Sequence, residues 1–226
     1  MKTSKFLLRW IIANAFGELV GLGIAGLVML AMVRSAPANP TILDALANVS
    51  SIVIFGAFEC AVVAYAQWLV LRSHIAVPKW VWVGATTLAA AIAWLLGLLP
   101  TTIVNISPML VPSVRQLFFL SMGFGFVSGV ILASGQTWVL RRFSTKAGWW
   151  LPANGAAWAV AMPIIFFSAA LPTAQTPLSV VIALLLTTVF VAGAAASAIH
   201  GPFLLMILNR LRKSVDEETH TIATAA

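Results

Sequence analysis

Six long apolar runs restrict what this chain of 226 residues can fold into. They cover residues 10–33, 51–71, 81–99, 117–140, 149–171 and 178–208. A helix needs about 20 apolar residues to cross the hydrocarbon core of a bilayer, and each run is close to or above that length. Charged residues make up only 8% of the chain, too few to cover the surface of a soluble domain, which is roughly a quarter charged. The sequence therefore predicts an all-α membrane protein with six transmembrane helices, whose first partner is the lipid bilayer.

The basic residues predict how these helices are oriented. If the N-terminus is cytoplasmic, eleven of the 13 Lys and Arg residues fall on the cytoplasmic side, and only Arg34 and Arg115 fall on the other. Since cytoplasmic loops are enriched in Lys and Arg, we expect both termini in the cytoplasm. The net charge of +7 is then a topology signal. Nucleic acid is not an expected partner, because the basic residues are scattered over short loops without a nucleic-acid-binding motif.

Two short strings recur along the chain. AQWLVLR at 66–72 is nearly repeated by GQTWVLR at 135–141, and tryptophans at positions 10, 80 and 150 are evenly spaced by 70 residues. The third copy has His200 where the first two have Gln. We therefore expect three parallel two-helix repeats of about 70 residues around an axis normal to the membrane, over residues 10–72, 80–142 and 150–212. Residues 1–213 form a single membrane domain in this interpretation, and 214–226 form a disordered polar cytoplasmic tail.

Four amide side chains are expected at one depth in the membrane. Gln67 and Gln136 each precede an arginine by five residues, which places their amides roughly 7–8 Å inside the cytoplasmic boundary. Asn14 and Asn154 lie at a comparable depth on their own helices. Two interpretations stay open: hydrogen bonds between helices, worth about 0.6 kcal/mol each, or a polar vestibule that opens to the cytoplasm.

Two carboxylates, Glu18 and Glu59, lie within predicted spans. An acid inside a membrane is costly unless it is paired, protonated or hydrated, so each is a candidate for a functional site. His200 lies at the expected depth of Glu18, and Arg115 could reach towards Glu59. Such pairs could fix helix register, or they could serve as a proton relay or a ligand contact.

The sequence contains no recognisable catalytic or metal-binding motif. Ser-His-Asp, H-E-x-x-H and Gly-rich phosphate patterns are absent, and one cysteine excludes an intrachain disulfide and a cysteine-based metal cluster. His200 could ligate a tetrapyrrole, but a haem held by two histidines needs a second one inside the membrane, and none is expected there. We therefore expect no metal and no cofactor, and enzymatic activity is the weakest class.

Four strings resemble an uncharacterised group of small bacterial multi-span membrane proteins that carry repeated Q-W-x-x-L-R phrases. They are W-x-x-A-N-A-x-G-E-L-x-G-L-G at 10–23, E-x-A-x-x-x-x-A-Q-W at 59–68, G-Q-x-W-x-L-R-R at 135–142 and A-I-H-G at 198–201. The resemblance extends over nearly the whole chain. It implies a bacterial cytoplasmic membrane and suggests no activity.

Three functions follow from these patterns as hypotheses. The first is a small carrier or membrane ligand-binding protein with an internal polar site formed by Asn14, Glu18, Glu59, Gln67, Gln136, Asn154 and His200. The second is an accessory or scaffold subunit of a larger membrane complex, in which the same side chains hold helices together. The third is an intramembrane enzyme.

Overall fold

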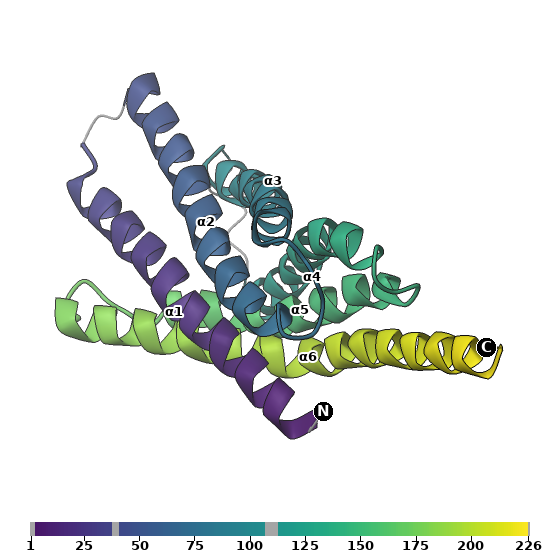
Figure 1. Cartoon of the computed structure of the whole chain (residues 1–226). Coiled ribbons are helices and arrows are strands. Elements are labelled where there is room, and N and C mark those ends of the chain that lie inside the picture. Colours follow the sequence, from purple (N-terminus) through teal and green to yellow (C-terminus); the bar gives the residue numbers. More distant parts are fainter. Residues whose placement is uncertain (1–2, 38–40, 107–112, 226) are drawn as a thin grey trace.

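The described part of the chain consists of long helices joined by short loops (Figure 1). The computed structural model describes residues 3–37, 41–106 and 113–225, without the side chains of 98–106 and 210–225. The elements are α1 (Thr3–Ser35), α2 (Ile42–Leu71), α3 (Lys79–Ile106), α4 (Val114–Leu140), the short 3-10 helix η2 (Ala147–Trp149), α5 (Trp150–Ala169) and α6 (Leu178–Ala225). Within those ranges no residue forms a β-strand. Six of the helices are long and apolar enough to cross a membrane, which confirms the six predicted apolar helices and fits an integral membrane protein.

Side-chain caps determine where two of these helices begin. The Thr41 hydroxyl accepts a hydrogen bond from the Asp44 backbone N–H, and the Thr41 N–H donates to the Asp44 carboxylate at 2.8 Å. Ser113 and Gln116 form the same reciprocal pair at the start of α4, also with a 2.8 Å bond from the backbone. Because the first N–H groups of a helix have no partner inside it, these capping boxes fix the first turns of α2 and α4.

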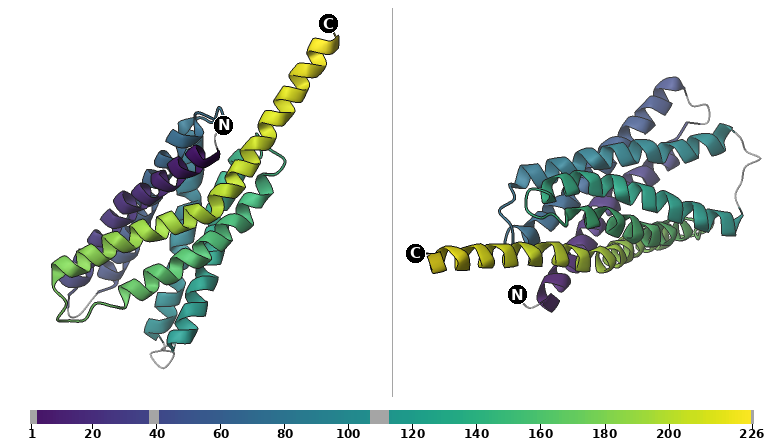
Figure 2. Two further views of the ribbon diagram at one scale, coloured as in Figure 1. Left: turned by 90° about the horizontal axis from the view of Figure 1, so that it is seen from below. Right: turned by 90° about the vertical axis from the view of Figure 1, so that its right-hand side faces the viewer.

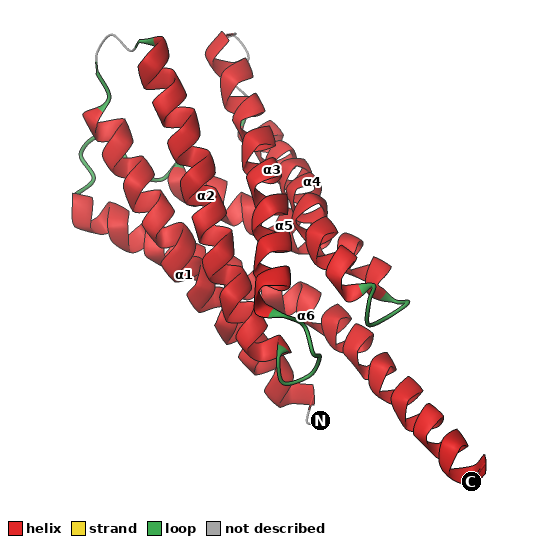
Figure 3. Ribbon diagram, turned by 45° about the horizontal axis from the view of Figure 1, so that its top comes forward, coloured by secondary structure: helices red, strands yellow, loops and turns green. Residues whose placement is uncertain are grey.

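The six helices form a closed ring in chain order. Each helix packs on the one before it and the one after it, and α6 closes the ring against α1. The ring is narrow at the end where the N-terminus lies and wide at the opposite end, where α1 and α2 are separated from α3 (Figure 3). We call these the narrow end and the wide end.

The main hydrophobic core lies at the narrow end. It is built from residues at the start of α1, α3 and α5, at the end of α2 and α4, and from the stretch of α6 that they contact. Its largest fully buried side chains are Phe6, Leu71, Trp82, Leu140, Leu204, Trp10 and Trp150. This packing closes the ring at the narrow end.

Glycines allow neighbouring helices to approach closely next to the polar residues. A Cβ atom on Gly21 would lie 2.8 Å from the backbone oxygen of Glu59, so α1 and α2 are in direct backbone contact there. On α4, a Cβ atom on Gly125 would collide with the carbonyl oxygen of Trp158 on α5. Small residues at helix contacts are typical of membrane proteins, and here they bring the intramembrane carboxylates of α1 and α2 onto adjacent surfaces.

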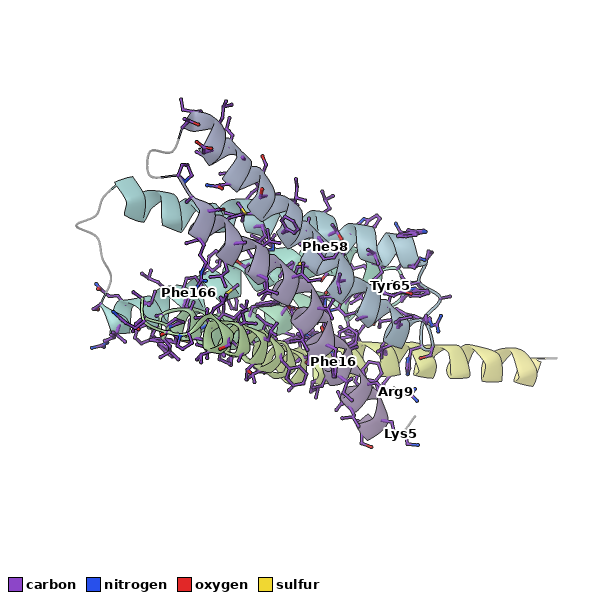
Figure 4. All side chains as sticks on the ribbon, turned by 90° about the vertical axis from the view of Figure 1, so that its left-hand side faces the viewer. Lys5, Arg9, Phe16, Phe58, Tyr65 and Phe166 are labelled. Carbon is purple, nitrogen blue, oxygen red and sulfur yellow. The ribbon has the colours of Figure 1, made fainter. Side chains whose placement is uncertain are left out.

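The outer surface of the ring is apolar, as a surface facing lipid requires. Phe16, Phe58 and Tyr65 point away from the bundle and are exposed (Figure 4). Lys5 and Arg9 project near the N-terminal end of α1 in the same view. The exposed side chains thus change from apolar to basic towards the narrow end of α1.

The last helix continues past the other helices at its C-terminal end. α6 extends to Ala225 over the residues for which the sequence predicts a polar tail, and it projects beyond the bundle (Figure 2). The physical reason is that no Gly or Pro follows Pro202 before the end of the described helix, so the sequence has no strong helix breaker there.

Candidate functional site

Three helices begin with the same local arrangement around a buried tryptophan. On α1, α3 and α5, the carbonyl oxygen of a fully buried Trp accepts a hydrogen bond from the polar side chain four residues later. The pairs are Asn14 with Trp10 at 2.8 Å, Thr86 with Trp82 at 2.9 Å, and Asn154 with Trp150 at 2.9 Å. Residues four apart lie on one helix face, so each pair presents an indole and a polar group to the interior together.

The tryptophan on α3 is not the one predicted from the even spacing of 70 residues. Trp80 is 75% exposed, whereas Trp82 is 0% exposed. Two residues correspond to a rotation of about 200° around the helix, so the side chains point to opposite faces. Trp80, which the spacing of 70 residues aligns with Trp10 and Trp150, is therefore not the residue that takes their buried position on α3. The string W-V-G-A-T at 82–86 matches the W-x-x-A-N strings of α1 and α5 better than the string that begins at Trp80 does.

The polar residues of α2 and α4 connect these pairs into one network. The Gln67 side chain donates to the Asn14 side-chain oxygen at 2.8 Å, and Gln136 donates to the Gln67 oxygen at 2.9 Å and to the Thr86 hydroxyl at 3.2 Å. The Gln136 oxygen accepts from the Trp150 indole at 2.7 Å. Gln67 and Gln136 therefore join α1 to α5 through α2 and α4.

His200 on α6 occupies a similar position to the glutamines. Its Nδ1 accepts a hydrogen bond from the Trp10 indole at 3.1 Å, just as Gln136 accepts from Trp150. The imidazole also packs against the edges of the Trp10 and Trp150 rings, with centroid separations of 5.8 and 5.0 Å. Since Nδ1 is already bonded, Nε2 is the nitrogen that remains for a ligand.

The two intramembrane carboxylates adjoin one another. The carboxyl groups of Glu18 and Glu59 lie within hydrogen-bonding reach, and each residue is less than 5% exposed. Glu59 Oε2 also accepts from the Trp94 indole at 3.2 Å and from the Cys60 thiol at 3.3 Å. Glu18 Oε2 is buried without a hydrogen-bond donor. Two carboxyl groups can hydrogen-bond only if one of them carries a proton.

The expected cationic partners do not reach these acids. Arg115 is exposed near the start of α4, and the part of α4 that lines the same cavity as Glu59 begins at Phe124, nine residues and about 14 Å further along. The predicted pairing of Arg115 with Glu59 is therefore wrong. His200 lines the same cavity as Glu18, but its observed bond is to Trp10. Among the described side chains, neither acid forms an ion pair.

Six of the seven candidate ligand-binding residues line one small interior cavity of about 30 Å³. They are Asn14, Glu18, Gln67, Gln136, Asn154 and His200. The volume is sufficient for a water molecule, and the lining is polar enough to bind one. The seventh residue, Glu59, lines a second, larger cavity of about 340 Å³ on the side towards the wide end, which we call the chamber.

The two cavities meet at a shared wall. Cys60, Leu132 and Trp158 line both of them. The chamber is largely apolar, whereas the small cavity is lined by the amide network. From the narrow end to the wide end, the interior of the ring thus changes from the hydrophobic core to the polar small cavity and then to the apolar chamber. The two carboxylates lie at the boundary of the two cavities.

Sequence reasoning missed Thr86 and Trp94 as members of the site. Thr86 could have been found from the W-x-x-A-T string, because it takes the position of Asn14 and Asn154. Trp94 carries no comparable signal, and only the packing of α2 on α3 brings it to Glu59.

The site offers little to a metal ion. In the ranges that the structure describes, no three His, Cys, Asp or Glu side chains are grouped as metal ligands would be.

No family model matches the chain, and no curated protein or solved structure matches it. The residues of the site are therefore the evidence for the function of the protein.

Proposed function

We propose that this protein is a small carrier or ligand-binding protein of the bacterial cytoplasmic membrane, with both termini in the cytoplasm. The observation that carries the proposal is the convergence of polar side chains from six helices on one small interior cavity, next to a chamber of about 340 Å³. Burying so many polar groups inside a membrane is costly unless they serve packing or a ligand. A chamber of this size is within the range of small-molecule sites, and packing alone does not require it.

A threefold internal repeat is part of this proposal. Three parallel two-helix repeats of about 70 residues would place one Trp and one polar side chain from each repeat around a common axis. The hydrogen bonds fit that pattern in two of the three positions, because the indoles of Trp150 and Trp10 each donate to the polar residue of the preceding even-numbered helix in the ring, Gln136 and His200. The indole N–H of Trp82 on α3 is buried without such a partner. Repeats of this kind form central sites in many transporters.

The second candidate is an accessory or scaffold subunit that assembles with other membrane proteins. It is favoured by the amide network, since Gln67 and Gln136 bond to side chains of neighbouring helices and stabilise the ring without any ligand. The two functions differ in one physical property. A ligand site must admit water and small solutes, whereas an interhelical contact excludes them.

Cys60 tests this difference because it is the single cysteine and it lines both cavities while being only 6% exposed. The protein in lipid nanodiscs, with both faces accessible, would be treated with a small water-soluble methanethiosulfonate reagent. If the chamber opens to solvent, Cys60 should be modified in the folded state. The matched control is Cys60→Ala with Ala64→Cys, because Ala64 is one helical turn away, fully buried in the hydrophobic core and outside both cavities.

We expect wild-type Cys60 to react at least about tenfold faster than the cysteine at position 64, which corresponds to a difference of about 1.4 kcal/mol in the free energy of exposure. Mass spectrometry of the intact protein measures both rates. Equal rates, with modification of either position only after denaturation, would support the scaffold function instead.

A further inference from the structure

The carboxylate pair at the boundary of the two cavities, where Glu59 lines the chamber and Glu18 lines the small cavity, has no cation to neutralise it within the described structure. Glu18 and Glu59 adjoin one another, and the other side chains that donate hydrogen bonds to Glu59 are Trp94 and Cys60. The residues that line the chamber include no Lys, Arg or His. Negative charge buried in this way is stable only with bound protons or a bound cation. The site is thus electrostatically complementary to a positive group.

One carboxylate oxygen of the pair, Glu18 Oε2, is an atom to which a positive group could bind. Glu18 Oε2 is buried and accepts no hydrogen bond, although the residue lies at the polar side of the boundary. A buried acceptor without a donor destabilises the protein, and more so when it is charged. A ligand that donates hydrogen bonds as well as charge would satisfy it, and an ammonium group does both.

The rest of the chamber is suited to an apolar molecule. Its walls include the aromatic side chains of Trp94, Trp158, Phe124 and Phe166, together with Met29 and Met162. Aromatic faces attract cations, and methionine adapts to ligands of different shape. An inorganic cation would leave this apolar volume unused, and an anionic amphiphile would be repelled by the carboxylates.

We infer that the chamber binds an amphiphilic organic cation, with its apolar body among the aromatic and methionine side chains and its ammonium group at Glu59 and Glu18. This inference rests on the proposed ligand-binding function and names the chemical class of its ligand. The ligand does not enter from the narrow end, which the hydrophobic core closes. In the ligand-free protein, a proton shared by the two acids takes the place of the ammonium.

Three compounds with one apolar body and different head groups test the inference: 4-phenylbutylammonium, 4-phenylbutanol and 4-phenylbutyrate. Equilibrium binding to the wild-type protein in nanodiscs would be measured for each and corrected with empty nanodiscs. We expect the ammonium compound to bind at least about tenfold more tightly than the alcohol, a difference of about 1.4 kcal/mol, and the carboxylate compound to bind least.

The double variant Glu18→Gln with Glu59→Gln should lower the affinity for the ammonium compound to that for the alcohol, and leave the affinity for the alcohol unchanged. The matched control, Glu217→Gln with Glu218→Gln, removes the same formal charge from the part of α6 beyond the bundle and should bind like the wild type. The comparison of head groups needs no variant, so it decides the question even if the double variant does not fold.

The results separate failure of the inference from failure of the proposed function. Equal affinity for the ammonium compound and the alcohol would overturn the cation inference and leave a ligand-binding chamber. Absence of binding by all three compounds, with Cys60 still reactive, would also overturn the inference alone. An unreactive Cys60 would overturn the proposed function and the inference with it.

Discussion

Gln136 is the residue whose removal tests the polar network most directly. Its side chain makes three hydrogen bonds to buried groups, to Gln67, Thr86 and Trp150, at 2.9, 3.2 and 2.7 Å. Gln136→Met preserves the length of the side chain and removes all three. At about 0.6 kcal/mol for an average hydrogen bond between membrane helices, the free energy of unfolding should fall by about 2 kcal/mol. The Trp150 indole N–H left without an acceptor would add to this loss.

The next residue provides a matched control. Thr137 is buried to a similar degree as Gln136, but its hydroxyl has no hydrogen-bond partner. Thr137→Val keeps the shape and removes an unsatisfied polar atom, so stability should stay the same or rise by up to about 1 kcal/mol. Unfolding in mixed micelles of mild detergent and sodium dodecyl sulfate, followed by circular dichroism, measures both values. Equal free energies of unfolding for the two variants would refute a stabilising role for the network.

Glycine substitutions on α4 test its close contact with α5. Gly125→Ala would place a Cβ atom against the carbonyl of Trp158 and should destabilise the protein by about 1–3 kcal/mol in the same unfolding assay. Gly123→Ala, with nothing within 4 Å, should be neutral or stabilising by up to about 1 kcal/mol, and similar losses for both variants would contradict the clash with Trp158 as the cause. For the orientation, a cysteine-free protein with a new cysteine at Ala174 should react with an impermeant thiol reagent in intact cells, while a cysteine at Ser73 should react only after permeabilisation. The opposite labelling pattern would overturn the prediction that both termini are cytoplasmic.

The helices and the depth of the polar residues could be predicted from the sequence. A backbone inside hydrocarbon must satisfy its own hydrogen bonds, so an apolar run of about 20 residues has few alternatives to a helix. Depth then follows from counting residues at 1.5 Å each from the basic boundary. This is why Asn14, Gln67, Gln136 and Asn154, whose common level follows from spacing alone, line one cavity.

The partners of those residues depended on the tertiary structure. Counting along the chain gives depth but leaves open which face of a helix meets which neighbour, since rotation and order in the ring are set by side-chain packing. The sequence therefore suggested Arg115 as the partner of Glu59. In the structure, the backbone contact at Gly21 brings Glu59 next to Glu18, and the packing of α3 on α2 brings Glu59 next to Trp94. The chamber itself is also a tertiary feature, because it exists only where the helices separate beyond the packed narrow end.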